Sequence, residues 1–111
     1  MSDPTGPVLS SEDKKLTTLA RATRARINAA EGAAVRDLDG RTYAGASVAL
    51  PSLTLSALEV CVAMAVASGS RGLEAAVVLT ASASVPSLDA VHEFAGPDVV
   101  VHVGDHRGIL R

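Results

Sequence analysis

The chain has 111 residues, with 10 basic and 12 acidic side chains, a net charge of −2, and a hydrophobic content of 48% that includes one Phe, one Tyr and no Trp. This length fits one compact domain whose core must be built from aliphatic side chains. Without excess positive charge or aromatic side chains on which bases could stack, the composition excludes nucleic acid as an expected partner.

The single cysteine, Cys61, lies within an apolar run and excludes an internal disulfide. The longest apolar stretch, residues 60–67, is too short to span a bilayer. Residues 1–7 are polar with Pro and Gly, which is not the pattern of a signal peptide. We therefore expect a soluble, cytoplasmic protein without a membrane partner, in which residues 1–9 form a disordered lead and residues 10–111 form one domain.

Residues 10–27 have the pattern of an amphipathic helix. Ser10 and Ser11 offer a cap, and the acidic pair Glu12 and Asp13 follows in the first turn, where negative charge is favourable. An apolar stripe at helical spacing is expected to cover one side of a sheet. The stripe consists of Leu16, Leu19, Ala20 and Ile27, and the other faces carry Lys14, Lys15, Arg21, Arg24 and Arg26.

Two extended segments follow this helix. Residues 32–36 form a short apolar run, and residues 41–48 contain the strand-forming Thr42 and Tyr43. Residues 37–40 between them supply turn chemistry, with a glycine available for a positive φ. Together they predict a β-hairpin.

A nearly uncharged helix is predicted over residues 53–68. Pro51 and Ser52 are expected to end the preceding strand and to cap this helix, and Gly69 to stop it. Glu59 is its only charged residue. Because a helix that is apolar all round is buried on more than one side, a domain of this size indicates contact with another subunit as well as with the sheet.

The last part of the chain predicts a strand over 75–80, a helix over 87–95 capped by Ser87, a strand over 98–103 and a short strand over 108–111. The resulting order is α-β-β-α-β-α-β-β. This order predicts the α/β class, as a three-layer α/β/α sandwich with a mixed sheet of about five strands.

Four short sequence segments, in this order, resemble the small free-nucleoside cytidine deaminases. The resemblance as a whole extends from about Leu16 to the end of the chain. Residues 32–36 with 39–41 are similar to the family's first hairpin, and 45–48 to the start of its substrate loop. Residues 53–57, L-T-L-S-A, are similar to the family's L-T-L-C-A-E at the catalytic helix, and Glu93-Phe94 closes a segment like the helix after its second metal motif. The resemblance implies the family's fold and its tetramers around the buried helix.

In that family, Cys thiolates, or a His and two Cys, hold a zinc ion that activates water, and a Glu transfers protons. The resemblance assigns the metal-ligand positions to Ser56, Ser84 and Ser87, and the acid position to Leu58. A serine hydroxyl stays protonated near pH 7 and is a poor zinc ligand. We therefore expect no zinc, no other cofactor and no catalytic residue of the family's kind.

Substrate-binding positions are also changed. Where the family has N-V-E, this chain has Ser47-Val48-Ala49, so the carboxylate that would hold the ribose is missing. The family's P-Y-S-x-F segment before Gly32 is also lost. Glu59 does not replace the acid, because one residue along a helix turns the side chain by about 100°. The combined loss of metal ligands, proton shuttle and sugar contact predicts a pseudoenzyme.

Other catalytic arrangements have weaker support. His102 and His106 are four residues apart, but they straddle a strand and a turn, so this spacing does not place them on one face as metal ligands with His92 or Asp98. Ser84 or Ser87 could be combined with a His and Asp105 as a triad, but no nucleophile-elbow sequence accompanies them.

Three functions remain open at this point. The first is association, as a homo-oligomer (dimer or tetramer) through the apolar helix 53–68 or with a protein partner. The second is a non-catalytic module that binds a nucleoside or related small molecule in a remnant pocket. That pocket would be lined by Ser47, Ser56, Ser84 and Ser87. The third is an enzyme after all, either a residual cytidine deaminase or a hydrolase of another kind.

Overall fold

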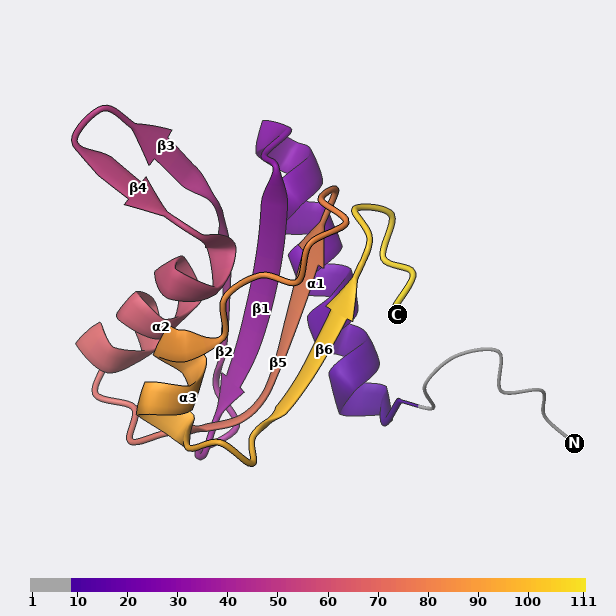
Figure 1. The fold of residues 1–111 in the computed structure, drawn as a ribbon. Helices are drawn as coiled ribbons and strands as arrows, with labels where there is room; N and C mark the ends of the chain where they lie inside the picture. The colour runs from indigo at the N-terminus through magenta and orange to yellow at the C-terminus, as the bar shows by residue number, and fades with distance from the viewer. Residues whose placement is uncertain (1–8) are drawn as a thin grey trace, which may run out of the picture.

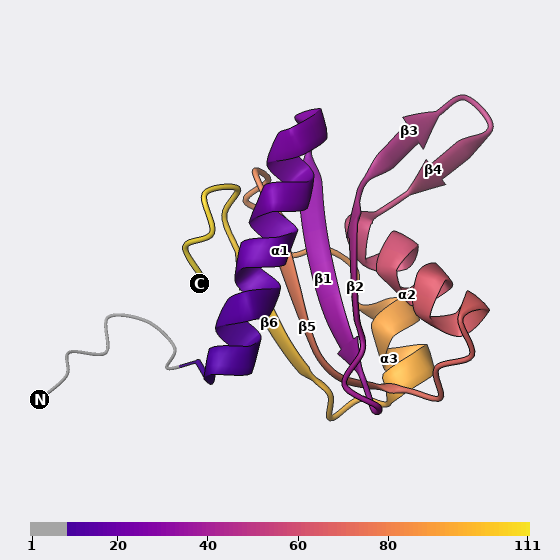
Figure 2. The same ribbon diagram turned by 180° about the vertical axis from the view of Figure 1, so that it is seen from behind.

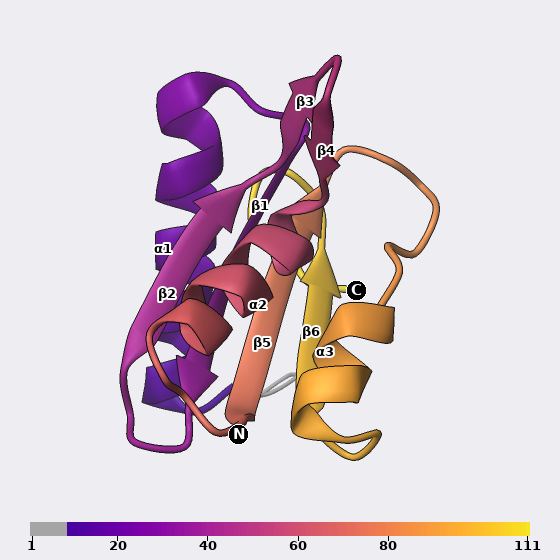
Figure 3. The same cartoon turned by 90° about the vertical axis from the view of Figure 1, so that its left-hand side faces the viewer.

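A computed structural model describes residues 9–111 as three layers (Figure 1). A four-stranded mixed sheet in the order β2-β1-β5-β6 has α1 on one face and α2 and α3 on the other, as Figures 2 and 3 show. The α/β/α sandwich expected from the sequence is confirmed. In chain order the elements are α1 (Ser11–Ile27), β1 (Glu31–Asp37), β2 (Thr42–Ala46), β3 (Val48–Leu50), β4 (Leu53–Leu55), α2 (Ala57–Ala67), β5 (Leu73–Thr80), α3 (Asp89–Ala95) and β6 (Val100–Gly104).

The sheet is one strand smaller than expected. β1 lies antiparallel to both β2 and β5, and β5 pairs with β6 in parallel. The last segment, 108–111, contributes only a bridge between Gly104 and Leu110. The glycine at 108 has a φ of +95°, which turns the chain immediately before this bridge. The expected lead over residues 1–9 falls, except for Leu9, outside the described residues.

The core is aliphatic and divided by the sheet into two clusters. Side chains alternate between the faces of β1 and β5 because successive strand residues point in opposite directions. Ala34 and Val77 face α1, whereas Ala33, Val35 and Val78 face α2 and α3. Cys61 is fully buried in the second cluster, and this burial raises the pKa of its thiol to about 12, so it packs as a small apolar residue.

Helix α1 begins where the sequence predicts. The Ser10 side chain accepts a hydrogen bond from the backbone N–H of Asp13 at 3.1 Å. Leu16 and Ala20 are fully buried against the sheet, but Leu19 and Ile27 of the expected stripe are 38% and 60% exposed. The buried surface of α1 is therefore narrower than the expected stripe, and it packs against Ala34, Ala75, Val77 and Leu79 of the sheet.

The expected helix 53–68 is wrong at its start. Residues 53–55 form β4 and pair antiparallel with β3, and α2 begins only at Ala57. The expected strand 41–48 correspondingly divides at Ser47 into β2 and β3. Residues 48–55, here called the β3–β4 arm, extend beyond one end of the sheet (Figure 1).

The helix expected from Ser87 begins two residues later. The Ser87 hydroxyl accepts a hydrogen bond from the backbone N–H of Asp89 at 3.3 Å, but Leu88 is the residue before the first helical turn. Such a local serine bond holds the chain in a turn rather than in a helix. Within residues 9–111, no helix is long and apolar enough to cross a membrane.

Asp13 ties the first turn of α1 to the sheet. One carboxylate oxygen lies 3.0 Å from the Arg36 guanidinium and the other 3.0 Å from His102 Nε2. Arg36 also donates to Glu74 at 2.7 Å. Burial acts to raise the pKa of the Asp13 carboxyl group, but the hydrogen bonds with His102 and Arg36 outweigh it and hold the pKa below the usual 3.8.

This cluster predicts loss of stability in acid. A carboxyl group whose pKa is lower in the folded chain stabilises the fold above its ordinary pKa, and the contribution disappears as pH falls through the folded value. We expect the thermal midpoint of Asp13→Asn, followed by circular dichroism, to fall less than that of the unaltered chain between about pH 5 and about pH 3. Asp98→Asn, which removes an exposed carboxylate elsewhere, serves as control. Equal acid sensitivity in all three proteins would contradict the assignment.

Gly32 sets how closely α1 approaches β1. A Cβ atom at this position would lie 2.3 Å from the backbone oxygen of Ala20 and 2.6 Å from the Arg24 Cβ. We expect Gly32→Ala to lower the free energy of unfolding by about 1–3 kcal/mol, because the helix must move away from the sheet. Urea denaturation measures the change. Asp39→Glu, which enlarges an exposed turn residue, should change it by less than about 0.5 kcal/mol.

Candidate functional site

The position that the resemblance assigns to the first metal ligand, Ser56, caps α2. Its side chain accepts a hydrogen bond from the Glu59 backbone N–H at 3.1 Å, and the Glu59 carboxylate accepts one from the Ser56 backbone N–H at 2.7 Å. These reciprocal bonds form a capping box, which satisfies two helix-terminal N–H groups at once. The hydroxyl and the nearest acid are therefore both used in starting the helix.

The position assigned to the catalytic acid lies in the core. Leu58 is 1% exposed and belongs to the cluster that packs between the sheet and the helices α2 and α3. Glu59, one residue later, is exposed and directed to its own cap. Neither residue presents a carboxyl group to a pocket.

Glu31 is a third residue at this helix start, and the sequence analysis missed it. Its carboxylate lies 3.4 Å from the backbone N–H of Ala57, where the positive end of the α2 dipole favours negative charge. The same residue exchanges two bonds with Ser47: its backbone N–H donates to the Ser47 hydroxyl, and its carbonyl accepts from the Ser47 N–H. The fold thus brings Glu31, Ser47 and the start of α2 together.

The other two assigned ligand positions lie in the exposed loop between β5 and α3. The Ser84 backbone N–H donates to the hydroxyl of Ser82, and the Ser87 hydroxyl accepts from Asp89. Arg111 holds the base of this loop through the carbonyl oxygens of Ser82 and Ala83, at 2.6 and 3.5 Å. Among the described residues, no hydrogen bond joins Ser84 or Ser87 to Ser47 or Ser56.

These donors do not fit a zinc ion. The three assigned positions offer neutral hydroxyls, and that of Ser56 already accepts a backbone hydrogen bond. Over residues 9–111, no group of three or more His, Cys, Asp or Glu side chains is placed to hold a metal ion. His102 is engaged by Asp13, and Asp105 accepts hydrogen bonds from Arg107 and Ile109 in its own turn.

A buried carboxylate at the other end of β1 is also structural. Asp37 is 1% exposed and accepts hydrogen bonds from the backbone N–H groups of Asp39 and Arg41 and from the Ser70 hydroxyl. The Ser70 bond, with smaller help from the two backbone groups, lowers the pKa of Asp37 against the effect of burial. Asp37 thereby closes the β1–β2 turn.

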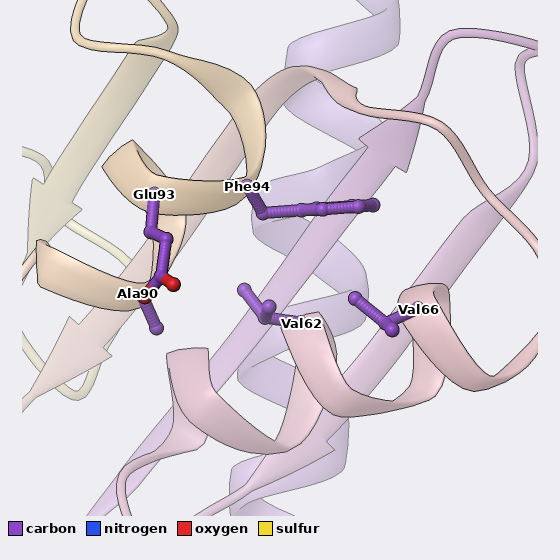
Figure 4. Close-up of a pocket in the computed structure, with 5 residues that line it drawn as sticks. All are labelled: Val62, Val66, Ala90, Glu93 and Phe94. Carbon is purple, nitrogen blue, oxygen red and sulfur yellow. The ribbon is translucent and has the colours of Figure 1, made fainter.

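The structure has a cavity away from these serines, between α2 and α3 (Figure 4). It has a volume of about 370 Å³. Val62 and Val66 of α2 line one side, and Ala90, Glu93 and Phe94 of α3 line the other. None of the four serines assigned to the remnant pocket is among its lining residues. Here it is called the α2–α3 groove.

Comparison with known proteins gives one family. The family model described as cytidine deaminase-like matches residues 9–108. The fold is similar to that of cytidine deaminase from Burkholderia pseudomallei, with a TM-score of 0.77, 23% identity, and coverage of 93% of this chain and 91% of that chain. Cytidine deaminase from Mycobacterium leprae has a TM-score of 0.68 and 22% identity, with coverage of 92% of this chain and 93% of that chain. Cytidine deaminase from Mycobacterium tuberculosis has a TM-score of 0.68 and 24% identity, with coverage of 92% of this chain and 90% of that chain. No curated protein sequence matches. At these identities the structural likeness establishes the fold.

The capping box predicts the effect of removing the Ser56 hydroxyl. Ser56→Ala leaves the Glu59 N–H without its intrachain acceptor, so we expect the free energy of unfolding to fall by about 0.5–2 kcal/mol. Chemical denaturation followed by circular dichroism measures the loss. Ser68→Ala, at the exposed C-terminal end of the same helix, is the matched control and should change stability little. Equal effects of the two substitutions would show that the hydroxyl does not cap α2.

Proposed function

This chain belongs to the cytidine deaminase-like family, and we propose that it is a member without zinc-dependent deamination, a single domain over residues 10–111 that acts by association. The observation that carries the proposal is the use of the Ser56 hydroxyl and the Glu59 carboxylate in the α2 cap, next to a fully buried Leu58. At the positions where the reaction needs a metal ligand and an acid, this chain has a capping hydroxyl and a buried leucine.

Hydrolytic deamination requires an attacking hydroxide near neutral pH and a group that moves protons to the leaving ammonia. Bound zinc supplies the first by lowering the pKa of its water. In this chain, the positions that the resemblance assigns to the ligands carry three neutral hydroxyls, and the position that it assigns to the acid carries a leucine. Since proton transfer by a positioned side chain alone contributes about 10²–10⁴-fold to a rate, the substitution of Leu for Glu is by itself a severe loss.

Binding of a nucleoside without chemistry has less support. The hydroxyls of Ser47 and Ser56 each already accept a backbone hydrogen bond, from Glu31 and Glu59. The cavity described above lies instead between α2 and α3, and four of its five lining residues are apolar.

The apolar surface around α2 supports association, as a dimer or tetramer or with another protein. Val66 on α2 is 52% exposed, and Leu50 and Leu53 on the adjoining arm are 57% and 48% exposed. Large aliphatic side chains exposed on α2 and on the arm that precedes it are available for contact with a partner.

The proposal is tested by zinc content and by cytidine turnover. We expect tag-free protein to contain less than about one tenth of an equivalent of zinc by elemental mass spectrometry, and to leave the ultraviolet absorbance of cytidine unchanged after zinc is added. A variant with Ser56→Cys, Ser84→Cys and Ser87→Cys is the matched control, because thiolates at these positions should take up the metal. About one equivalent of zinc in the unaltered chain, or turnover abolished by Ser56→Ala, would overturn the proposal.

A further inference from the structure

We propose that the outer face of α1 binds an acidic segment of another protein. The surface consists of the exposed side chains of Lys14, Lys15, Arg21 and Arg26, and it is called here the basic face. It lies on the layer opposite α2 and α3 (Figure 2). The inference goes beyond the proposed function, because it assigns a second contact surface that does not depend on association through α2.

Positive charge is concentrated on this helix. Although the whole chain has a net charge of −2, α1 contains five of the ten basic side chains and only two of the twelve acidic ones. The fifth cation, Arg24, is half-buried and donates to the Ala29 carbonyl group at 2.9 Å, so it is not part of the basic face. A cationic helix on an otherwise anionic chain produces a local positive potential, which attracts acidic groups and speeds their arrival.

The two acids of α1 leave most of this charge without a partner. The carboxylate of Asp13 is directed to the sheet, where it contacts Arg36 and His102. Glu12 lies 3.3 Å from the Lys15 ammonium group, but both side chains are exposed, and exposed pairs contribute little. Within residues 9–111, no carboxylate lies at ion-pair distance from the other three cations of the basic face. These three cations are therefore available to a partner.

The four cations form two rows along the exposed side of α1. At about 100° of rotation per residue, Lys14 and Arg21 lie on one side of the helix crest, and Lys15 and Arg26 lie on the other. The crest between the rows carries the short, exposed side chains of Thr18, Ala22 and Ala25. With a rise of about 1.5 Å per residue, the rows extend over about 18 Å, the length of about five extended residues. One acidic segment that lies along the crest therefore reaches both rows.

The chemistry of the basic face favours a protein over nucleic acid or a membrane. Bases stack on aromatic side chains, but the two aromatic residues of the chain, Tyr43 and Phe94, pack on the α2 side of the sheet. A helix that lies in a membrane interface inserts a wide apolar face, whereas Leu19 is the only large apolar side chain exposed within residues 14–26. Carboxylates of Asp and Glu accept hydrogen bonds from Lys and Arg without stacking or insertion. An acidic peptide segment therefore fits this face.

The first test measures binding of a fluorescent peptide of about eight residues, in which glutamate alternates with alanine, because this length covers the basic face when extended. We expect fluorescence anisotropy to detect binding at about 20 mM salt and at least about tenfold weaker binding at about 300 mM, since salt screens exposed charges. Arg21→Gln with Arg26→Gln should weaken binding at least about fivefold. The matched control, Arg41→Gln with Arg71→Gln, removes two exposed cations outside α1 and should weaken it less than about twofold. No binding at low salt, or equal losses in the two variants, overturns the inference.

The second test compares this peptide with the two other classes of partner. The unaltered chain is mixed with vesicles that contain phosphatidylserine and, separately, with a single-stranded DNA of the same charge as the peptide, both at low salt. We expect little sedimentation with the vesicles and weaker binding of the DNA than of the peptide. Tighter binding of either one, lost in Arg21→Gln with Arg26→Gln, overturns the inference. Zinc content and cytidine turnover do not involve α1, so a failure here is distinguishable from a failure of the proposed function.

Discussion

The reciprocal hydrogen bonds between Ser56 and Glu59 fix the first turn of α2, because both partners satisfy N–H groups that no other helix residue can reach. Three features depend on this start. Residues 53–55 are left outside the helix and pair as β4. Leu58 falls on the buried side of the first turn. Glu59 is held at the cap and is therefore withdrawn from any role in a pocket.

The capped start of α2 and the buried Leu58 do not by themselves account for the stability of a domain that, as proposed, binds no zinc. A structural zinc ion can contribute about 10–16 kcal/mol in the small domains that depend on it, and a capping serine only about 1 kcal/mol. Full burial of a leucine adds about 1.5–3 kcal/mol. The stabilising free energy of the cap and of Leu58 together is therefore smaller than that of a structural zinc ion. The aliphatic clusters on both faces of the sheet and the close approach of α1 at Gly32 carry the fold instead.

The sequence predicted those features that depend on local pattern. The start of α1 followed from Ser10 and the acids after it, and the three-layer order followed from the alternation of apolar runs. Leu53-Thr54-Leu55 was assigned to a helix because Pro51 and Ser52 offer a strand end and a cap before it, although the S-x-x-E spacing of Ser56 and Glu59 contains the correct boundary. The contact of Glu31 with Ala57 spans 26 residues, and the α2–α3 groove joins two separate helices. Neither has a local signal, because both arise from tertiary packing.

The two outer layers of the sandwich differ in a way that bears on association. The outer surface of α1 carries exposed cations, among them Lys14, Lys15 and Arg21, and these side chains are costly to remove from water without partners. On the opposite layer, α2 has one charged residue, and its carboxylate is occupied by the cap. Removing α2 from water therefore buries fewer charged groups than removing the outer face of α1. If the chain associates as proposed, this asymmetry favours contact through the layer that contains α2.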